Sequence, residues 1–527
     1  MMDLAMNAHA DPPSAGLSLN ELSTVLSGMA ARVIGDASAR VVGVRQDSRR
    51  VEAGELFVAR QGGKTSGAAY ALDAAAKGAV ALMIERGEPL PATRLPVLEV
   101  SNVKRALALA AEAVYGFPSR SVDVIGITGT NGKTTTTFLT EQGLVGAGLV
   151  PARLGTLGFE MGGHTFGDTL TTPEADDIAR CLLEVKKRGG THLVMEVSSI
   201  AVVQERVSGL RFRAAAFTNL TQDHLDFHGT LDAYAEAKAE LFTRLSPEAS
   251  VIHVGDSFGR QLAGRVRSGL LTVGRRDAQV RVIDSQLSAR GIRAKVITPR
   301  GECELVSPLV GEHNLENLLV ALGILVALGS RPSVAAQALS QAPQVPGRLE
   351  RCEGVDDDVL VAVDYAHTPD ALARVLTAVR ALGQGRVRCV FGCGGDRDPS
   401  KRAPMGEAVG RGADYAIVTS DNPRREAPQA IVDMILPGLT SVAGAFEVTL
   451  DRAQAIENAV LGAAPGDVIL IAGKGHEDYQ IVGAEKRHFD DREEARRALA
   501  LRRGRGRTST STSAKQQEDG KTGRRES

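Results

Sequence analysis

The sequence predicts an α/β protein of three domains: a small N-terminal α/β domain, a central domain with a parallel sheet, and a C-terminal doubly wound, Rossmann-like domain. Three observations lead to this prediction. The chain has 527 residues, which is too long for a single hydrophobic core. A glycine-rich turn joins a strand to a helix at 122–137. From 360 to 472, strands and helices alternate as they do in a doubly wound sheet.

We place the N-terminal domain at 18–118, the central domain at 119–347 and the C-terminal domain at 348–502. The sequence Pro346-Gly347-Arg348 marks the hinge into the last domain. Residues 1–17 and 503–527 are expected to be disordered. The C-terminal segment is rich in Ser, Thr, Arg and Lys and has no large apolar residues, so it has nothing to bury.

Composition excludes several classes of function. The net charge is -1 and the chain has no Trp, which argues against nucleic acid as a partner. The five cysteines show no CxxC pairing, which suits free thiols in a reducing compartment. The N-terminus has no basic, apolar leader, and the longest apolar run, Leu318 to Leu328, is too short to span a bilayer. We therefore expect a soluble cytoplasmic protein that does not insert into membranes.

The N-terminal domain should contain strands at Val41–Val44, Glu55–Ala59 and Ala79–Ile84, with a helix at Tyr70–Lys77. The polar sequence Asp47-Ser48-Arg49 lies between the first two strands. On this segment alone, the favoured interpretation is a capped turn with a surface salt bridge.

The central domain begins with a phosphate-loop pattern. Val122–Ile127 is a short buried strand, Gly129 and Gly132 break it, and Lys133-Thr134 open a helix that should end near Gly146. Lys133 would reach the β- and γ-phosphates of a nucleotide, and the Thr134 hydroxyl would bind Mg²⁺.

The strict P-loop spacing requires a glycine where Ile127 stands, so this is the shorter GTNGKT form. A lone glycine-rich turn is often only a turn. The preceding strand, the following helix and three further threonines, Thr135 to Thr137, favour phosphate binding and a P-loop ATPase-like domain.

Downstream segments supply candidate metal ligands. The strand at Thr191–Val197 places Glu196 at a carboxyl end beside the loop, where Mg²⁺ or its water would lie; the alternative is a paired acid at the edge of the core. After the strand Ala214–Asn219, the sequence 221–229 holds two His and two Asp, and the alternative there is a hydrophilic loop that caps a helix at Leu231. Lys238 in that helix looks by composition like an ordinary solvated lysine.

The rest of the central domain is described by four local patterns. Gly158–Gly167 should form a hairpin, and Thr171 to Glu174 should start a helix with Pro173 in its first turn. Three alternating runs suggest antiparallel strands at Gln279–Ile283, Gly291–Thr298 and Glu302–Val306. Gly311–Leu328 should be a helix with Asn314 and Asn317 near its start.

In the C-terminal domain a polar cluster follows each predicted strand. The strands are Leu360–Tyr365, Val387–Cys393, Tyr415–Ser420 and Val468–Ala472, and the helices are Pro369–Leu382, Ala403–Gly412, Gln429–Leu436 and Arg452–Gly462. The clusters are DYAH at 364–367, GGDR at 394–397, DNPR at 421–424 and GKGHE at 473–477. Ligands of open α/β sheets bind beyond the carboxyl ends of the strands, and arginines there suit the two-point binding of carboxylates.

The order of these motifs resembles that of the Mur ligases of peptidoglycan synthesis, from about Leu19 to Leu501. The shared motifs are DSR, GTNGKT, TTP, MEVSS, FTNLTQDHLDFHG, EAK, PGR, DYAHTPD, FGCGGDRD, DNPR and GKGHE. Within the family the chain is similar to the members that add meso-diaminopimelate to UDP-N-acetylmuramoyl-L-alanyl-D-glutamate. The resemblance implies an ATP-dependent, ADP-forming amide ligase that uses Mg²⁺ and works through an acyl phosphate. We expect a monomer, although the sequence does not determine the oligomeric state.

The resemblance also implies roles for residues. The N-terminal domain would bind the UDP substrate, the central domain ATP and the C-terminal domain the amino acid. Catalytic roles fall on Lys133, Glu196, His224 and Lys238, and metal binding on Thr134, Glu196, His224 and Lys238 as a carbamate. ATP would be bound by Gly129, Thr130, Asn131, Gly132, Lys133, Thr134, Thr135, Asn314, Arg348 and Asp364.

Two further sets concern the other substrates. The UDP-muramyl dipeptide would contact Ser48, Thr171, Thr172, Ser198, Gln204 and Arg206. Diaminopimelate would contact Arg397, Asp421, Asn422, Pro423, Arg424, Gly473 and Glu477. The arginine of DNPR marks diaminopimelate, because lysine lacks the distal carboxylate. Two departures, Ile200 in place of a common His and Gly63-Lys64-Thr65 in place of a loop with His and Gln, affect the muramyl side.

Four alternatives stay open at this point. They are the L-lysine-adding ligase, a folylpolyglutamate synthase-like ligase, a P-loop NTPase of another class and a catalytically inactive binding protein. Arg424 argues against lysine, and the N-terminal domain with its DSR motif argues against the folate enzyme. The carboxylate-binding clusters argue against a switch or motor, and intact Lys133, Glu196 and Lys238 argue against an inactive protein.

Overall fold

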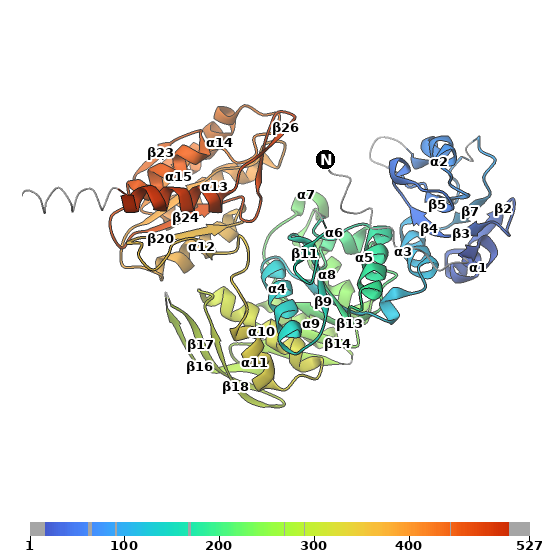
Figure 1. Ribbon diagram of the computed structural model, residues 1–527, viewed down its shortest axis with the longest axis horizontal. Helices are drawn as coiled ribbons and strands as arrows, with labels where there is room; N and C mark the ends of the chain where they lie inside the picture. Colours follow the sequence, from blue (N-terminus) through green and yellow to red (C-terminus); the bar gives the residue numbers. More distant parts are fainter. Residues whose placement is uncertain are drawn as a thin grey trace, which may run out of the picture. The chain divides into compact units, whose positions relative to one another are not determined.

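The computed structural model describes residues 16–61, 66–89, 92–166, 170–267, 269–288, 290–442 and 444–504. The chain forms two compact units (Figure 1). The first unit comprises Met1–Asp284, Ala294–Leu305 and Glu316–Ala342, and the second comprises Ser285–Arg293, Val306–Leu315 and Pro343–Ser527. In the described residues no helix combines the length and the apolar character needed to cross a membrane.

The N-terminal part of the first unit contains a small sheet with its own core. The strands are β1 (Leu17–Ser18), β2 (Arg32–Ile34), β3 (Arg40–Val41), β4 (Gly43–Arg45), β5 (Glu55–Val58), β6 (Ala81–Glu85) and β7 (Val97–Val100), and the helices are α1 (Leu19–Val25), α2 (Ala71–Ala76) and α3 (Val103–Val114). Short 3-10 turns lie at Ser27–Met29, Ser48–Arg50, Gly67–Tyr70 and Pro118–Arg120. The main sheet has the order β2-β7-β6-β5-β4.

Two expectations for this region are wrong in detail. The strand expected at Val41–Val44 is divided: β3 pairs with β1, whereas β4 pairs in parallel with β5. At the start of β4 the Glu55 side chain packs on Gly43, where a Cβ would lie 2.8 Å from a carboxylate oxygen of Glu55. Leu17, assigned to the disordered N-terminus, pairs with Val41 in β1. Residues 1–15 of that segment lie outside the described residues.

The central sheet is large and mostly parallel. Its strands are β8 (Asp123–Thr128), β9 (Pro151–Gly155), β10 (Gly158–Met161), β11 (His164–Thr165), β12 (His192–Glu196), β13 (Phe212–Phe217), β14 (Ala249–His253), β15 (Leu270–Gly274), β16 (Val280–Ser288), β17 (Gly291–Thr298) and β18 (Gly301–Ser307). The order is β11-β10-β9-β12-β8-β13-β14-β15-β16-β17-β18. The parallel pairs of β8 with β12 and with β13 bring the carboxyl ends of three strands to one edge.

Helices cover this sheet and connect its strands. They are α4 (Lys133–Gly146), α5 (Ala175–Lys187), α6 (Ser199–Val203), α7 (Leu225–His228), α8 (Leu231–Thr243), α9 (Ser257–Arg265), α10 (Glu312–Ala327) and α11 (Pro332–Ser340). Helix α5 begins at Ala175 with Glu174 as N-cap, so Pro173 precedes the helix and does not lie in its first turn as expected. The hairpin expected at Gly158–Gly167 is confirmed by the antiparallel β10–β11 pair, although its last residue lies outside the described part.

The second unit contains the doubly wound sheet. Its strands are β19 (Glu350–Arg351), β20 (Leu360–Asp364), β21 (Val387–Phe391), β22 (Tyr415–Val418), β23 (Phe446–Val448) and β24 (Val468–Ala472), followed by a hairpin of β25 (Tyr479–Val482) and β26 (Glu485–His488). The helices are α12 (Pro369–Arg380), α13 (Arg402–Gly412), α14 (Pro428–Thr440), α15 (Arg452–Leu461) and a last helix over 491–504. The sheet order is β19-β20-β24-β21-β22-β23.

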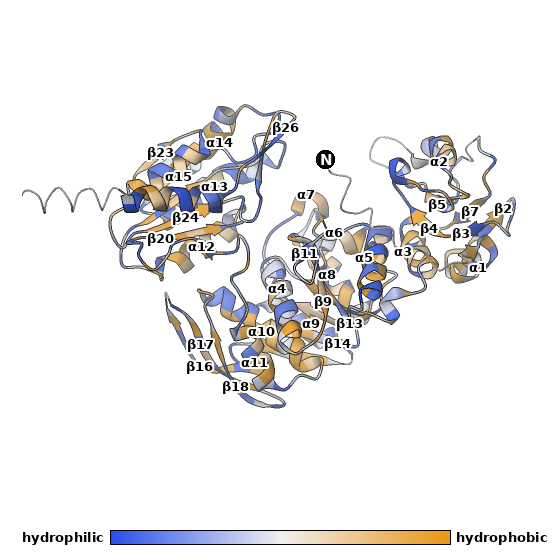
Figure 2. Ribbon diagram, in the orientation of Figure 1, coloured by the Kyte–Doolittle hydropathy of each residue, from blue (hydrophilic) through white to orange (hydrophobic). Residues whose placement is uncertain are grey.

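The four predicted strands and four predicted helices of this domain are all present, and the fold class is confirmed. Figure 2 shows β20 and β24 as largely hydrophobic, and each face of the sheet packs on its own cluster of buried residues. Strands β19 and β23, the β25–β26 hairpin and the last helix were not predicted. That helix reaches residue 504, two residues into the expected disordered tail, and residues 505–527 lie outside the described part.

A buried carboxyl group in α3 gives the first unit a pH-dependent stability. Glu112 is 2% exposed; Ser119 donates a hydrogen bond to its Oε2 at 2.7 Å, and Oε1 has no partner in the described structure. Burial raises the pKa of Glu112 to about 7. The folded chain holds this proton up to about pH 7, whereas the unfolded carboxyl group releases it near 4.5. The stabilising contribution is therefore complete below 4.5 and is lost as pH rises through about 7.

We expect Glu112→Gln to flatten the pH dependence of unfolding. The amide keeps the acceptor for Ser119 but cannot ionise. Between pH 5 and pH 8 the free energy of unfolding should fall less in the variant than in the wild type, by on the order of 2–3 kcal/mol. Denaturant titrations at both pH values measure this difference, and equal slopes for the two proteins would contradict it.

Candidate active site

The loop after β8 is built to leave its backbone open to an anion. Gly129 has φ +149 and Gly132, the N-cap of α4, has φ +85. A Cβ at Gly129 would collide with the Thr218 hydroxyl, and one at Gly132 would collide with the Asn317 amide. The segment that follows β13 holds the loop in place, because the Asn219 carbonyl accepts a hydrogen bond from the Thr130 N–H at 2.8 Å. Glycine is thus required at both positions, and the helix dipole of α4 points at the loop.

Lys133 folds back over this loop. Its Nζ donates to the carbonyl oxygens of Gly129 and Thr130, each at 2.9 Å. The side chain is only partly buried. The phosphate role that the sequence indicates for Lys133 stays a prediction.

Glu196 ends β12 beside the first turn of α4. It is 2% exposed, and its Oε2 accepts from the Thr134 hydroxyl at 3.0 Å while Oε1 accepts from the Thr156 N–H at 2.8 Å. A Cβ at Gly155 would collide with the same carboxylate. The structure therefore brings together Thr134 and Glu196, two of the four predicted metal ligands.

These oxygen donors fit Mg²⁺, which prefers hard ligands and is usually held by one or two carboxylates with phosphates and water completing its shell. No group of three or more His, Cys, Asp or Glu side chains suited to a metal occurs in the part of the chain that the structure describes. Thr134 and Glu196 would supply one hydroxyl and one carboxylate oxygen to such an ion, and the metal-binding roles of His224 and Lys238 stay predictions.

Lys238 is the largest departure from the sequence-based expectation, because it is not solvated. It is 1% exposed in α8, and its Nζ donates to the Gly129 carbonyl at 2.9 Å, the same oxygen that Lys133 contacts. Burial lowers the pKa of Lys238 well below its usual value, and the charge of Lys133 lowers it further. At a given pH, more of this amine is therefore unprotonated than in an exposed lysine.

Tyr234 is a central residue of this site that the sequence did not predict. Its hydroxyl donates to Thr130 Oγ1 at 3.2 Å, and its ring centroid lies 4.2 Å from Lys238 Nζ. The rings of His224 and His228 lie 6.1 and 5.1 Å away. Tyr234 precedes Lys238 by four residues on α8, so helical spacing could have paired them if the face had been known to be buried.

His224 lies at the start of the one-turn helix α7 in the left-handed conformation, with φ 52. Burial lowers its pKa and Asp223 opposes that effect, so the neutral imidazole is favoured. Nε2 of His228, at the end of α7, lies 2.9 Å from the hydroxyl oxygen of the buried Ser199. The predicted polar cluster at 221–229 therefore lies over Tyr234, in the same region as Lys238.

A chain of hydrogen bonds leads from Glu196 to the predicted muramyl contacts. The Thr172 hydroxyl donates to the Glu196 carbonyl at 2.8 Å and accepts from the Ser198 N–H at 2.9 Å. Arg206 donates to the Thr172 carbonyl at 2.9 Å, and Thr171 lies 3.3 Å from Thr156 between hydroxyl oxygens. Gln204 is the C-cap residue that follows α6, the helix that contains Ile200.

A cavity of about 860 Å³ lies between the small sheet and α5. Ser48 lines it, and the Asp47 side chain both caps the Arg49 N–H and pairs with the Arg49 guanidinium at 2.7 Å, as the turn interpretation predicts. Gly63-Lys64-Thr65 lies outside the described residues. The cavity is lined by cations and anions together, namely Arg45, Arg49, Arg50, Arg60 and Lys77 with Asp47, Asp73, Glu174, Asp176 and Asp177.

Glu174 joins the two parts of the first unit and was not predicted. Arg60 pairs with its Oε2 and Arg206 with its Oε1, each at 2.7 Å. Helices α3 and α5 lie side by side through the buried Tyr115 and Leu183 (Figure 1). These contacts link Arg60 of the N-terminal part to Arg206 of the central part, and the TTP motif gave no hint that the following glutamate joins them.

In the second unit, Arg348 and Asp364 lie together. The Arg348 guanidinium stacks 4.6 Å from the Tyr365 ring centroid. Asp364 accepts from the backbone N–H groups of Leu349 at 2.7 Å and Ala366 at 2.8 Å; burial raises its pKa and Arg348 opposes this. Asn314, buried at the start of α10, donates to the Val310 carbonyl. The ring of Tyr365 gives this cluster a flat apolar surface.

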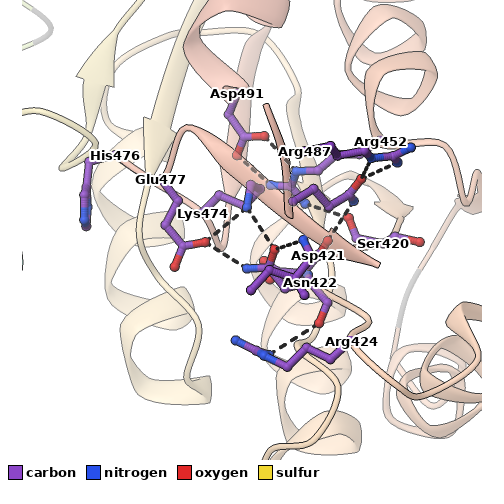
Figure 3. A network of polar contacts seen from close by, with 12 residues as sticks. Ser420, Asp421, Asn422, Arg424, Arg452, Lys474, His476, Glu477, Arg487 and Asp491 are labelled. Carbon is purple, nitrogen blue, oxygen red and sulfur yellow. Dashed lines mark hydrogen bonds and ion pairs between the residues drawn. The ribbon is translucent and has the colours of Figure 1, made fainter. Parts of the chain in front are cut away.

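The predicted amino-acid site is brought together at the carboxyl ends of β22 and β24 (Figure 3). Asn422 donates to Glu477 Oε2 at 2.9 Å. A Cβ at Gly473 would lie 2.7 Å from Asp421 Oδ2, and one at Gly394 would lie 3.0 Å from Arg424 Nη1 and 3.6 Å from Arg397 Cγ.

Arg424 is fixed by its backbone. It has φ 52, and its N–H donates to the Ile481 carbonyl while its own carbonyl accepts from Gly483. Its Nη1 donates to the Gly395 carbonyl at 2.8 Å. Pro423 is buried, and a Cβ at Gly395 would collide with its carbonyl. The unpredicted hairpin β25–β26 therefore holds the DNPR loop in place.

Comparison with known proteins identifies the family of this chain. Family models described as "Mur ligase family, catalytic domain", "Mur ligase middle domain" and "Mur ligase, glutamate ligase domain" match residues 40–115, 127–325 and 347–475. The UDP-N-acetylmuramoyl-L-alanyl-D-glutamate--2,6-diaminopimelate ligase of Gloeobacter violaceus is 45% identical over 467 residues, covering 88% of this chain and 94% of the relative. The enzyme of the same name from Geobacter metallireducens is 42% identical over 506 residues, covering 92% and 98%.

Solved structures give the same result. A structure of a UDP-N-acetylmuramoyl-L-alanyl-D-glutamate--2,6-diaminopimelate ligase is similar with a TM-score of 0.67 and 31% identity, covering 93% of this chain and 99% of that one. A Mycobacterium tuberculosis folylpolyglutamate synthase, at 18% identity and a TM-score of 0.58, covers 69% and 91% and shares the fold alone. The chain therefore belongs to the Mur ligase family of ATP-dependent ligases.

Proposed function

We propose that this chain joins meso-diaminopimelate to UDP-N-acetylmuramoyl-L-alanyl-D-glutamate, forming an amide bond with conversion of ATP to ADP and phosphate. One observation carries the choice of amino acid. Arg424 and Arg397 approach the same glycine, Gly394, beside a carboxylate and amide set formed by Asp421, Asn422 and Glu477. Relatives with 42–45% identity bear the name of this ligase.

The amino-acid site has the complementary charges for a dicarboxylic diamine. A guanidinium binds a carboxylate through two parallel hydrogen bonds, which suits Arg424 to the distal carboxylate of diaminopimelate. Asp421 and Glu477 supply negative charge for its ammonium group. L-lysine has the ammonium but no distal carboxylate, so it would leave Arg424 without its ligand.

In the proposed reaction the γ-carboxylate of D-glutamate attacks the γ-phosphate of ATP, giving an acyl phosphate and ADP. The amine of diaminopimelate then attacks the acyl carbon, and phosphate leaves. The protein contributes position and charge: Lys133 turns from its loop carbonyls to the phosphates, and the N–H groups of the glycine loop face them. The ordered loop removes the cost of arranging these groups during the reaction.

Lys238 is proposed to be carboxylated. Its neutral amine would add to CO₂, releasing one proton and forming a carbamate anion. Mg²⁺ bound by Thr134, Glu196, His224 and this carbamate would neutralise charge on the phosphates and the substrate carboxylate. The low pKa of Lys238 supports this proposal, because only the unprotonated amine is a nucleophile.

The UDP-muramyl dipeptide is assigned to the cavity lined by Ser48. A nucleotide diphosphate needs cations, and Arg49, Arg50 and Lys77 line this space. The hydrogen-bonded route through Thr172 and Ser198 continues towards Glu196. The cytoplasm is the proposed location, because all five cysteines are free thiols and a reducing compartment keeps them so.

The proposal is tested by the release of ADP. Purified enzyme with ATP, Mg²⁺ and the UDP-muramyl dipeptide should release ADP at a rate that depends on added meso-diaminopimelate, and the product should gain the mass of that amino acid less water. L-lysine should support much less release at equal concentration. A rate that does not respond to diaminopimelate would overturn the proposal.

Arg424→Ala should raise the KM for diaminopimelate by about 10- to 100-fold, the loss expected for a hydrogen-bonded charge. The KM for ATP should not change, because in the described structure the Arg424 side chain donates to the carbonyls of Gly395 and Asn422, within the proposed amino-acid site. The matched control is Arg425→Ala, which removes the adjacent, exposed arginine that pairs with Asp396. Equal effects of the two variants on the KM for diaminopimelate would contradict the role of Arg424.

A further inference from the structure

Lys474 is a buried cation in the amino-acid site to which no role has been assigned. It follows β24 and is 0% exposed. Its Nζ lies 3.1 Å from Glu477 Oε2 and 3.4 Å from Asn422 Oδ1, and 5.3 Å from the Tyr479 ring centroid (Figure 3). Two of these three neighbours are residues that the proposed function assigns to diaminopimelate.

An ammonium group that is withdrawn from water must be paired to be tolerated. The charge of Lys474 is paired with Glu477, and the same ammonium group donates a second hydrogen bond to the side-chain oxygen Oδ1 of Asn422. The lysine therefore does not simply fill space in the core. Its placement is stable only because the carboxylate and the amide face it.

The contacts of Lys474 fix two side chains in single orientations. Asn422 Oδ1 accepts from the Ile481 N–H at 2.9 Å as well as from Lys474, and its Nδ2 donates to Glu477 Oε2 at 2.9 Å. The amide group cannot flip without losing three hydrogen bonds. Glu477 Oε2 accepts from both Asn422 Nδ2 and Lys474 Nζ. Oε1 is then the carboxylate oxygen that can face a ligand.

A second buried cation fixes the backbone beneath these side chains. Arg452 pairs with Asp491 through two hydrogen bonds of 2.7 Å, and both side chains are 0% exposed. It also donates to the Ala472 carbonyl at 3.0 Å and the Ser420 carbonyl at 3.4 Å. Strand β21 separates β22 from β24 in the sheet, so Arg452 is a direct link between their two following loops.

We propose that Lys474 is a positioning residue for the amine-bearing substrate, acting through Glu477 and Asn422. The inference rests on the proposed function, since it takes these two residues to bind that substrate. Arg452 fixes the backbone of the loops that follow β22 and β24, and Lys474 orients the Asn422 and Glu477 side chains on those loops. Loss of the ammonium should therefore weaken binding of the amino acid and leave the nucleotide sites unchanged.

The test uses Lys474→Met, which keeps the length of the side chain and removes its charge. We expect its KM for meso-diaminopimelate to rise by about 10- to 100-fold, because small misplacements of binding groups have effects of this size. The KM values for ATP and for the UDP-muramyl dipeptide should equal those of the wild type. The control, Lys486→Met, removes an exposed ammonium 3.8 Å from the centroid of the same Tyr479 ring and should not change any KM.

A second variant, Lys474→Arg, keeps the charge but replaces a point donor by a planar fork, so its KM for diaminopimelate should lie between those of the wild type and Lys474→Met. If the methionine variant does not fold, as judged by its melting curve, the arginine variant decides alone: a raised KM with unchanged ATP binding supports the proposal, and a wild-type KM overturns it.

The remaining outcomes are also decisive. A folded Lys474→Met enzyme with an unchanged KM for diaminopimelate, or one in which all three KM values and the melting temperature change together, overturns the positioning role. If instead the wild-type enzyme shows no release of ADP dependent on diaminopimelate, the proposed function fails. The two failures are distinguished by the wild-type assay.

Discussion

Lys238→Ala should lower kcat by about 10²- to 10³-fold, the size of effect seen when one preorganised charge is removed from an active site. The buried amine lies 2.9 Å from the Gly129 carbonyl of the phosphate loop, where a carbamate anion would be placed to serve Mg²⁺. The melting temperature should not fall in proportion, because removing a fully buried ionisable group also removes its cost of desolvation. Activity and stability should therefore separate in this variant.

Three measurements check the prediction. Steady-state rates give kcat, and an enzyme equilibrated with ¹³C-bicarbonate should show one carbamate carbon signal that Lys238→Ala lacks. Wild-type enzyme freed of dissolved CO₂ should lose activity and regain it when bicarbonate is added. The control is Lys187→Ala, which removes an exposed lysine at the end of α5.

Two results would contradict this account. One is full activity of Lys238→Ala. The other is a wild-type enzyme that works at its normal rate with no carbamate signal. Loss of activity together with a large drop in melting temperature would show that Lys238 has a structural role, which the contact with Gly129 also allows for.

The phosphate loop could be predicted because its geometry is local. Strand, glycines and helix follow one another within 122–137, so every residue that shapes the loop lies close to the others in the sequence. The same holds for the clusters after β20, β22 and β24, since parallel strands bring their carboxyl ends to one edge whatever the crossovers between them. These rules need no knowledge of distant contacts.

The burial of Lys238 could not be predicted, because it depends on a contact with Gly129, 109 residues earlier in the chain. The sequence AEAKAELF around it suits either a surface or a core helix. Arg452 is a similar case: it looks like the first residue of an ordinary helix, and its partner Asp491 lies beyond a hairpin that the sequence did not reveal. Pairings of this kind are set by tertiary packing alone.

Lys133→Met should also lower kcat, by about 10²- to 10³-fold, because the loop loses the ammonium group that is proposed to neutralise charge on the transferred phosphate. Lys133 Nζ contacts the carbonyls of Gly129 and Thr130, which the loop presents whether or not the lysine is there. The fold of the loop should therefore survive, since its glycines and its contacts with Asn219 are unchanged. Unchanged melting with lost turnover is the expected result.

This variant should also change the chemistry of Lys238. The charge of Lys133 is one of the two causes that lower the pKa of Lys238, and burial is the larger. Without Lys133 that pKa should rise, so less of the amine is neutral at a given pH and less carbamate forms at a given CO₂ concentration. The ¹³C signal of the variant should then be weaker at neutral pH and should recover as the pH is raised. A carbamate signal equal to that of the wild type at every pH would mean that the two lysines, although they share the Gly129 carbonyl, do not influence one another's ionisation.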